Sequence, residues 1–143
     1  MRNILIAVAV LGLLGPGCSK KGEPGSAGAA TDEAVTASNA WLAVVDAERY
    51  GESWEQACAY FKNVVPKDQW ERQVAGVRGP LGPVLSREVV SAEFTTKLPG
   101  APDGEYVVIQ YRTKFQNKAD AIETVTPMRD QDGVFRVSGY YVR

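Results

Sequence analysis

Two opposite charges on predicted strands are the side chains best placed to do chemistry. Arg87 and Glu123 each stand between two apolar residues on the same face of a predicted strand. A charge with such neighbours can point into the core, where it must be paired. Three interpretations stay open: the two residues line a pocket and orient a polar ligand, they form a structural ion pair, or they lie on an exposed face.

A pocket built around these charges would draw on further polar and aromatic side chains. The candidate pocket residues are Asp46, Trp54, Arg87, Tyr111 and Glu123. Two carboxylates could also act as acid and base in a small hydrolase or isomerase, with Asp46 paired to Glu48 or to Glu123. Carboxylates are common and the sequence gives no distance between them, so we expect a non-enzymatic protein with no catalytic residue.

Composition excludes several other kinds of site. The 143 residues contain no His, two Cys, and sixteen Lys and Arg against seventeen Asp and Glu, which gives a net charge of −1. Without a basic stripe, nucleic-acid binding is not expected. Without His, and with only two Cys, the chain offers no metal site and no usual general base. Nothing in the sequence implies a cofactor.

The first residues resemble a bacterial lipoprotein signal. A positive charge at Arg2 precedes an apolar stretch at 4–14, which is too short to span a bilayer of about 30 Å. Cys18 follows a Gly-Pro-Gly break, and the resemblance implies that its thiol is acylated and that residues 1–17 are removed as the signal peptide. An ordinary signal cut at 27–29 is the alternative.

The resemblance also implies a location. Ser19 after the acylated Cys is compatible with the outer membrane, so we expect a lipid-anchored (palmitate-bearing) protein of the cell envelope that faces the periplasm. Residues 18–30 are small, polar and Gly-rich, which predicts a flexible tether. The expected partners are the membrane, through the lipid, and an unknown envelope protein or small ligand.

The folded part is expected at 31–143, and it begins with three helices. Thr31 can cap a helix that runs to about residue 48. Capping-box spacing at Ser53 and an apolar stripe predict a second helix to about residue 65, and a third is expected at 67–78. Three Trp, at positions 41, 54 and 70, sit on these stripes and are expected in the core, with an aromatic ligand platform as the alternative. Cys58 is expected to be a buried, inert thiol.

After a Gly- and Pro-rich break at 79–83 the hydrophobic period changes to two. Strands are expected at 84–98, 105–115, 121–128 and 134–142, and the turns between them carry Gly, Pro, Asp and Asn. The predicted fold class is α+β, with three N-terminal helices packed on a curved four-stranded antiparallel sheet.

Several short motifs in one order resemble the bacterial family catalogued as domain of unknown function 4019. They are Ala40-Trp41-Leu42, Asp46, Tyr50, Ser53-Trp54, Trp70, Arg-Gly-Pro-Leu-Gly at 78–82, Arg87, Pro-Gly-Ala-Pro-Asp-Gly-Glu-Tyr at 99–106, Glu123-Thr124-Val125 and Asp-Gly-Val-Phe-Arg-Val-Ser-Gly-Tyr at 132–140. The resemblance covers about 40–143 and implies export but no activity. The helices-then-sheet order is also similar to the nuclear transport factor 2-like (cystatin-like) fold, which implies a cone-shaped pocket by analogy alone.

Overall fold

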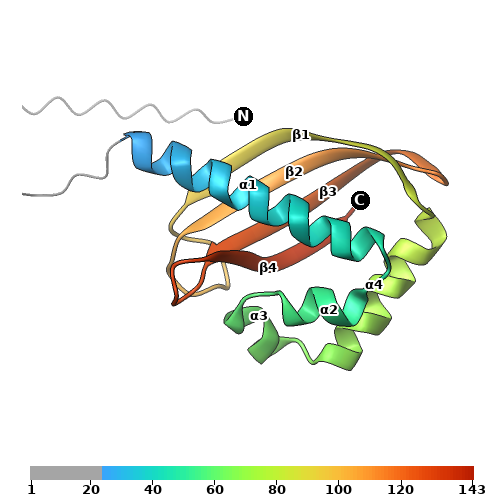
Figure 1. The fold of residues 1–143 in the computed structure, drawn as a ribbon, viewed down its shortest axis with the longest axis horizontal. Coiled ribbons are helices and arrows are strands. Elements are labelled where there is room, and N and C mark those ends of the chain that lie inside the picture. The colour runs from blue at the N-terminus through green and yellow to red at the C-terminus, as the bar shows by residue number, and fades with distance from the viewer. Residues whose placement is uncertain (1–23) are drawn as a thin grey trace, which may run out of the picture.

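A computed structural model describes residues 24–143 (Figure 1). The expected signal peptide, Cys18 and the tether up to residue 23 lie outside the described residues. Four helices come first and four strands follow, in the order α1 (Pro24–Asp46), α2 (Tyr50–Glu55), α3 (Ala59–Val64), α4 (Lys67–Leu81), β1 (Val84–Thr95), β2 (Tyr106–Phe115), β3 (Lys118–Arg129) and β4 (Phe135–Val142). The described helices include none that is long and apolar enough to cross a membrane.

The strands form one open antiparallel sheet in the order β1-β2-β3-β4. This confirms the predicted α+β class and the meander of four strands, although the helices number four and not three. The turn at 130–133 is also as expected, with Gly133 at a positive φ of 84° and its N–H bonded to the carbonyl of Asp130 at 2.9 Å. Gly and Pro mark such turns because few other residues tolerate the backbone angles.

The first helix begins earlier than predicted. It starts at Pro24, so residues 24–30 are helical and not part of a flexible tether. Thr31, expected as the helix cap, lies inside the helix, and its hydroxyl donates to the carbonyl of Ala27 at 2.8 Å. Pro suits the first turn of a helix, and Ala30 and Ala34 are buried against the core. This burial and the high helix propensity of Ala favour the longer helix.

The predicted second helix is divided into two short helices, α2 and α3. At the break, the backbone of Cys58 is extended, and its N–H donates to the carbonyl of Val137 in β4 at 2.9 Å. Its sulfur accepts from the N–H of Phe61 and so caps α3. This hydrogen bond to the sheet takes the place of a bond within a helix. It is a tertiary contact, which sequence periodicity does not reveal. Cys58 is buried as predicted, and burial raises the pKa of its thiol.

The last helix continues through Gly79 and Pro80, which were predicted to end it. Its final carbonyls are satisfied from the turn between β2 and β3: the side-chain amide of Asn117 donates to Pro80, and its N–H donates to Leu81. Gly82 follows with φ of 74° and ψ of −171°, a backbone conformation that residues other than Gly rarely adopt, and the helix ends there.

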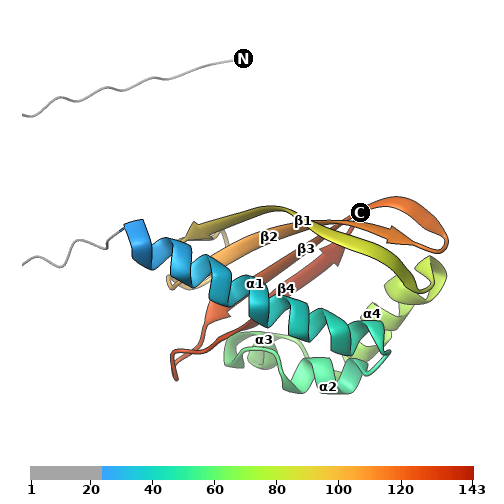
Figure 2. The ribbon, with the colours of Figure 1, turned by 45° about the horizontal axis from the view of Figure 1, so that its top comes forward.

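The helices pack on one face of the sheet. Figure 2 shows the strands arching over α1, which crosses this inner face, and α2 to α4 packing beside it towards β4. Trp41 and Trp70 are buried in the core and contact each other and Tyr140, as their helical spacing predicts. Trp54 is only partly buried against this core. The opposite face of the sheet carries exposed polar residues such as Arg112 and Lys114.

Candidate functional site

The inner face of the sheet holds a buried carboxylate at its centre. Glu123 of β3 is fully buried, and its Oε1 atom lies 2.7 Å from Nε of Arg87 on β1. Thr113 of β2 donates to the same oxygen at 2.5 Å, and Tyr140 of β4 donates to the other oxygen at 2.6 Å. Arg87 and Glu123 therefore point inward and form an ion pair, which is one of the three interpretations that the sequence left open. Every strand of the sheet contributes one side chain to this group.

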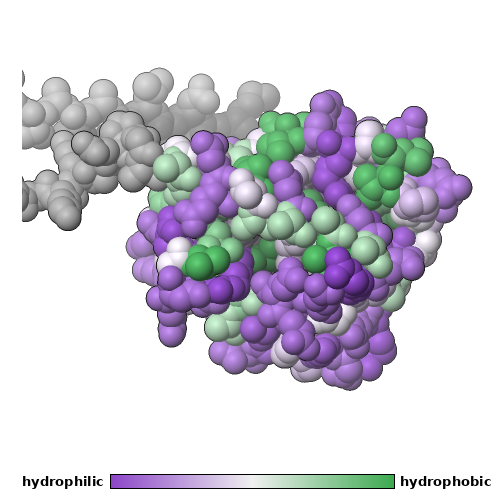
Figure 3. All heavy atoms as spheres, in the orientation of Figure 1, coloured by the Kyte–Doolittle hydropathy of each residue, from purple (hydrophilic) through white to green (hydrophobic). Residues whose placement is uncertain are grey.

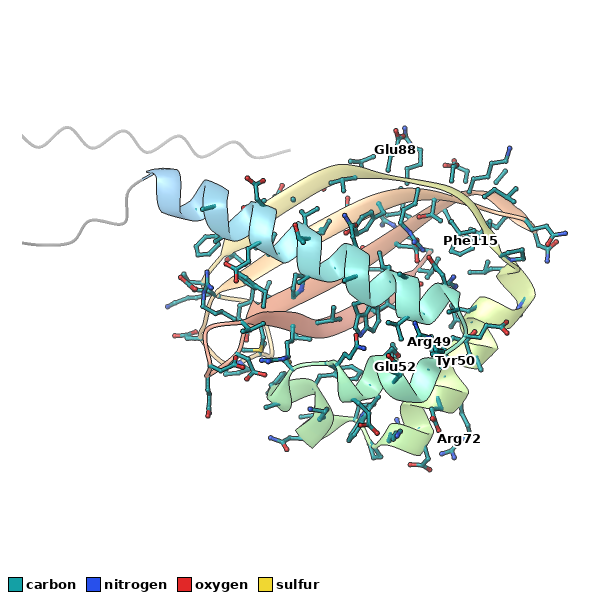
Figure 4. The ribbon with its side chains drawn as sticks, in the orientation of Figure 1. Arg49, Tyr50, Glu52, Arg72, Glu88 and Phe115 are labelled. Atoms are coloured by element: carbon teal, nitrogen blue, oxygen red, sulfur yellow. The ribbon has the colours of Figure 1, made fainter. Side chains whose placement is uncertain are left out.

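Two helices complete the cluster. Asp46, the last residue of α1, accepts two hydrogen bonds from Arg87, at 2.7 and 3.0 Å, and one from Arg78 of α4 at 2.7 Å. The Arg78 side chain is almost fully buried, with its guanidinium 5.1 Å from the centre of the Phe115 ring. Figure 4 labels Phe115, which lies at the end of β2 where α4 meets the sheet. We call Asp46, Arg78, Arg87 and Glu123 the charge cluster.

The charges hold one another in their ionised forms. Burial raises the pKa of Asp46, but the hydrogen bonds and charges of Arg87 and Arg78 outweigh it and hold that pKa below its ordinary value. Burial alone would lower the pKa of Arg87. Its hydrogen bonds to Asp46 and Glu123 outweigh burial and keep that pKa above its ordinary range. The pKa of Tyr140 is raised, first by burial and then by the charge of Glu123.

The charge cluster is suited to holding α1 and α4 against the sheet. Two cations face two anions, and both oxygens of each carboxylate already accept hydrogen bonds. A general acid near neutral pH needs a raised carboxyl pKa, whereas the pKa of Asp46 is lowered. Among the cluster's polar side-chain atoms, Nε of Arg78 is buried without a partner.

An open hollow lies beside the cluster, between α1 and β1. It has a volume of about 340 Å³ and is lined by Asn39, Ala43, Asp46, Arg87, Val89 and Tyr111. The hydroxyl of Tyr111 donates to the side-chain carbonyl of Asn39 at 2.9 Å. Burial raises the pKa of Tyr111 to about 12, so this hydroxyl stays protonated at neutral pH. A smaller hollow of about 260 Å³ lies on the other side of Asp46, beside Arg78 and Tyr50.

Four of the five candidate pocket residues come together in this region. Asp46, Arg87 and Tyr111 line the larger hollow, and Glu123 lies directly behind Arg87. The fifth, Trp54, lies elsewhere: its indole N–H donates to the carbonyl of Val65 at 2.7 Å and so ties α2 to the end of α3. Trp54 packs against the core, as its helical spacing predicts, and it does not line the hollow.

The sequence analysis missed Arg78, although a signal for it exists. Trp70, Val74 and Arg78 recur at four-residue intervals on one helix face, and all three are buried. That spacing places Arg78 on the buried side of α4, where a charge requires a partner. Glu48, the alternative carboxylate partner of Asp46, is exposed in the turn after α1 with a φ of 59°.

This is an α+β domain in which the charge cluster, with two cations and two anions, joins the helices to the antiparallel sheet. Residues 37–140 match the family model described as "Protein of unknown function (DUF4019)". The chain belongs to this family, which confirms the resemblance inferred from its motifs. No curated protein sequence and no solved structure matches the chain.

Proposed function

We propose that this chain is a lipid-anchored protein of the bacterial envelope whose domain binds another envelope protein without catalysing a reaction. The anchor is supported by the sequence, in which Cys18 follows an apolar segment of signal-peptide length. More than one acyl chain is needed for stable attachment, and a processed lipoprotein Cys supplies them. The order of helices and strands is consistent with a cystatin-like fold, by analogy.

Exposed apolar side chains on β1 carry the proposal of a protein partner. Leu85, Val89 and Val90 are 59%, 44% and 43% exposed, and they are three of the seven large apolar residues that lie exposed in the described part of the chain. Figure 3 shows hydrophobic surface along the upper rim of the molecule, where Figure 1 places β1. Clustered apolar residues on a soluble surface are typical of interaction sites.

A site-specific photo-crosslinker tests this proposal in the host envelope. We would introduce the crosslinking residue at Val90 on β1 and, as the matched control, at Val134, which is similarly exposed in the turn before β4. We expect one discrete crosslinked protein from Val90 and none from Val134. Equal labelling from both positions, or none from either, would contradict a partner at β1.

The anchor needs its own test. Cys18→Ser removes the thiol that accepts the lipid, so we expect the variant to lose its acylated mass and to accumulate uncleaved. The mature chain from the wild type should begin at an acylated Cys18. An unlipidated wild-type chain that begins after residue 29 would overturn the anchor and leave a secreted domain.

Binding of a small polar ligand is the second candidate function. The 340 Å³ hollow favours it, because the polar side chains of Asn39 and Arg87 line it beside the apolar wall of Ala43 and Val89. Native mass spectrometry of the chain extracted from its own host would reveal a bound molecule. A ligand that is retained by the wild type and lost on Asn39→Ala would favour this candidate over a protein partner.

A further inference from the structure

We infer that the free edge of β1 binds an extended, apolar and basic segment of the partner protein, which adds to the sheet as a fifth strand. This inference rests on the proposed function and names the partner's chemistry and its mode of binding. Three features support it: the unoccupied backbone edge, the exposed apolar side chains of β1 and the unpaired carboxylates near this edge.

The two edges of the sheet differ. At the β4 edge, the carbonyl of Val137 accepts from the N–H of Cys58, and α3 packs against the strand. Along β1, no described backbone or side-chain group outside the sheet bonds to the backbone of residues 85–95. An edge strand presents a row of N–H and C=O groups that can pair with another chain.

Side chains beside this edge offer a place for an apolar group. Val89 is exposed on the inner side of β1 and faces Asn39 and Ala43 of α1 across the 340 Å³ hollow. Side chains of an added strand alternate between the two faces of the sheet. Every second side chain of the partner would therefore point to the side of α1, and the one nearest residue 89 would contact Val89 at the hollow.

Two carboxylates near this edge favour a basic partner: Asp32 lies on α1, and Glu93 lies on the outer face of β1, opposite Val108 of β2. Helix α1 contains three acidic residues and no Lys or Arg. The single base of β1, Arg87, is already bound by Asp46 and Glu123. Asp32 of α1 and Glu93 of β1 are exposed and form no ion pair with any described residue. Lys or Arg at the ends of the partner segment would complement these two carboxylates.

The shape of the edge favours a short segment over a second copy of this chain. The pairing of β1 with β2 shifts register between Val84 and Ser86 and again between Val89 and Ser91. Such bulges bend an edge strand and interrupt long pairing. The uninterrupted stretch of 91–95 is long enough to pair with a short extended peptide.

Displayed peptides provide a direct test on the full-length chain in detergent. The library would contain eight-residue peptides with Lys at both ends and Val, Ile or Thr between them. We expect selected peptides to slow amide exchange within 91–95. Two sets of peptides would carry N-methyl groups on alternate backbone nitrogens. The set in which the methylated nitrogens face β1 should lose binding, and the other set should still bind. Replacing the terminal Lys with Glu should weaken binding.

A pair of variants locates the site. Val89→Lys should weaken peptide binding by about tenfold or more, because it places a charge at the hollow. Val64→Lys, at an apolar position on α3 that is 57% exposed against 44% for Val89, should change binding by less than about twofold. Thermal melts would confirm that both variants fold.

Three outcomes would overturn strand addition. They are a library without binders, equal loss from both sets of methylated peptides, and a chain that dimerises alone and is made monomeric by Val89→Lys. The last outcome would assign the edge to a second copy. A crosslinked partner at Val90 combined with any of them would leave the proposed function intact and refute only this mode of binding, whereas no crosslink would refute the proposed function itself.

Discussion

Glu123 is the residue on which the inner face of the sheet depends most. Removing its carboxylate by Glu123→Ala leaves Arg87, Thr113 and Tyr140 without their shared acceptor inside the core. Breaking a buried ion pair from one side costs about 3–5 kcal/mol, and here it would leave the two cations Arg78 and Arg87 facing the single carboxylate of Asp46. We expect this loss in the free energy of unfolding, measured by urea denaturation at neutral pH.

An exposed ion pair supplies the control. Glu33 lies 3.3 Å from Arg129 at the surface, so Glu33→Ala should cost no more than about 1 kcal/mol. Similar losses for the two variants would mean that the charge cluster is not a structural centre.

Asp46 should make stability depend on pH in the acid range. Its folded-state pKa is depressed below the ordinary 3.8, so its contribution is fully present above the unfolded-state value and is lost as pH falls through the folded one. The stability advantage of the wild type over Asp46→Asn should be constant from pH 7 to about pH 5 and shrink below about pH 4. Urea denaturation of both chains at several pH values measures this. A difference that grows on acidification would show that burial, and not Arg78 and Arg87, controls this carboxyl.

Much of this cluster could be predicted from the sequence. The apolar neighbours of Arg87 and Glu123 indicated that both charges can point inward and pair, although a ligand pocket and an exposed face also stayed open. That Asp46 joins the same cluster could not be derived in this way, because it approaches from a different element and its partners depend on how α1 crosses the sheet. The four-residue spacing of Trp70, Val74 and Arg78 was enough to predict that Arg78 is buried. Arg78 was missed because Gly79 and Pro80 were predicted to end the helix directly after it.

At the scale of elements, the strands were easier to predict than the helices. Turns rich in Gly, Pro and Asp separate the strands, and these local signals hold wherever the strands pack. The helix boundaries instead depend on tertiary contacts. The bond from Cys58 to Val137 divides α2 from α3, and Asn117 stabilises the end of α4. No local pattern reports either contact.

The early start of α1 gives a sharp prediction at the same scale. Gly28 lies within the helix, and a Cβ added there would meet nothing within 4 Å. Gly28→Ala should therefore increase stability by about 0.5–1 kcal/mol, since Ala costs less backbone entropy in a helix than Gly. Circular dichroism and thermal melts would measure the gain.

Gly28→Pro is the complementary variant, because Pro after the first turn removes a helical bond and clashes with the preceding turn. We expect it to reduce helical signal and stability. If both variants left stability unchanged, residues 24–30 would act as the flexible tether that composition alone predicts.

For the whole molecule, the most informative feature is the asymmetry of the sheet. Its inner face is covered by α1 and by the aromatic core around Trp41 and Trp70, and its β4 edge is bonded at Val137 by the N–H of Cys58. The charge cluster fixes the position of α1 and α4 on this face. Along 85–95 of β1 no described group outside the sheet bonds to the backbone, so this edge offers the longer run of free backbone groups to a partner that pairs with the sheet.

Amide hydrogen exchange of the isolated full-length chain would test this asymmetry without any partner. Amides of the central strands β2 and β3 have neighbours on both sides and should exchange only on global unfolding. In β1, amides that point to β2 should be protected, and those between them should exchange near their intrinsic rates. Uniform protection along β1 in a dilute sample would mean that the edge is already covered, and a partner strand could then bind only by displacing what covers it.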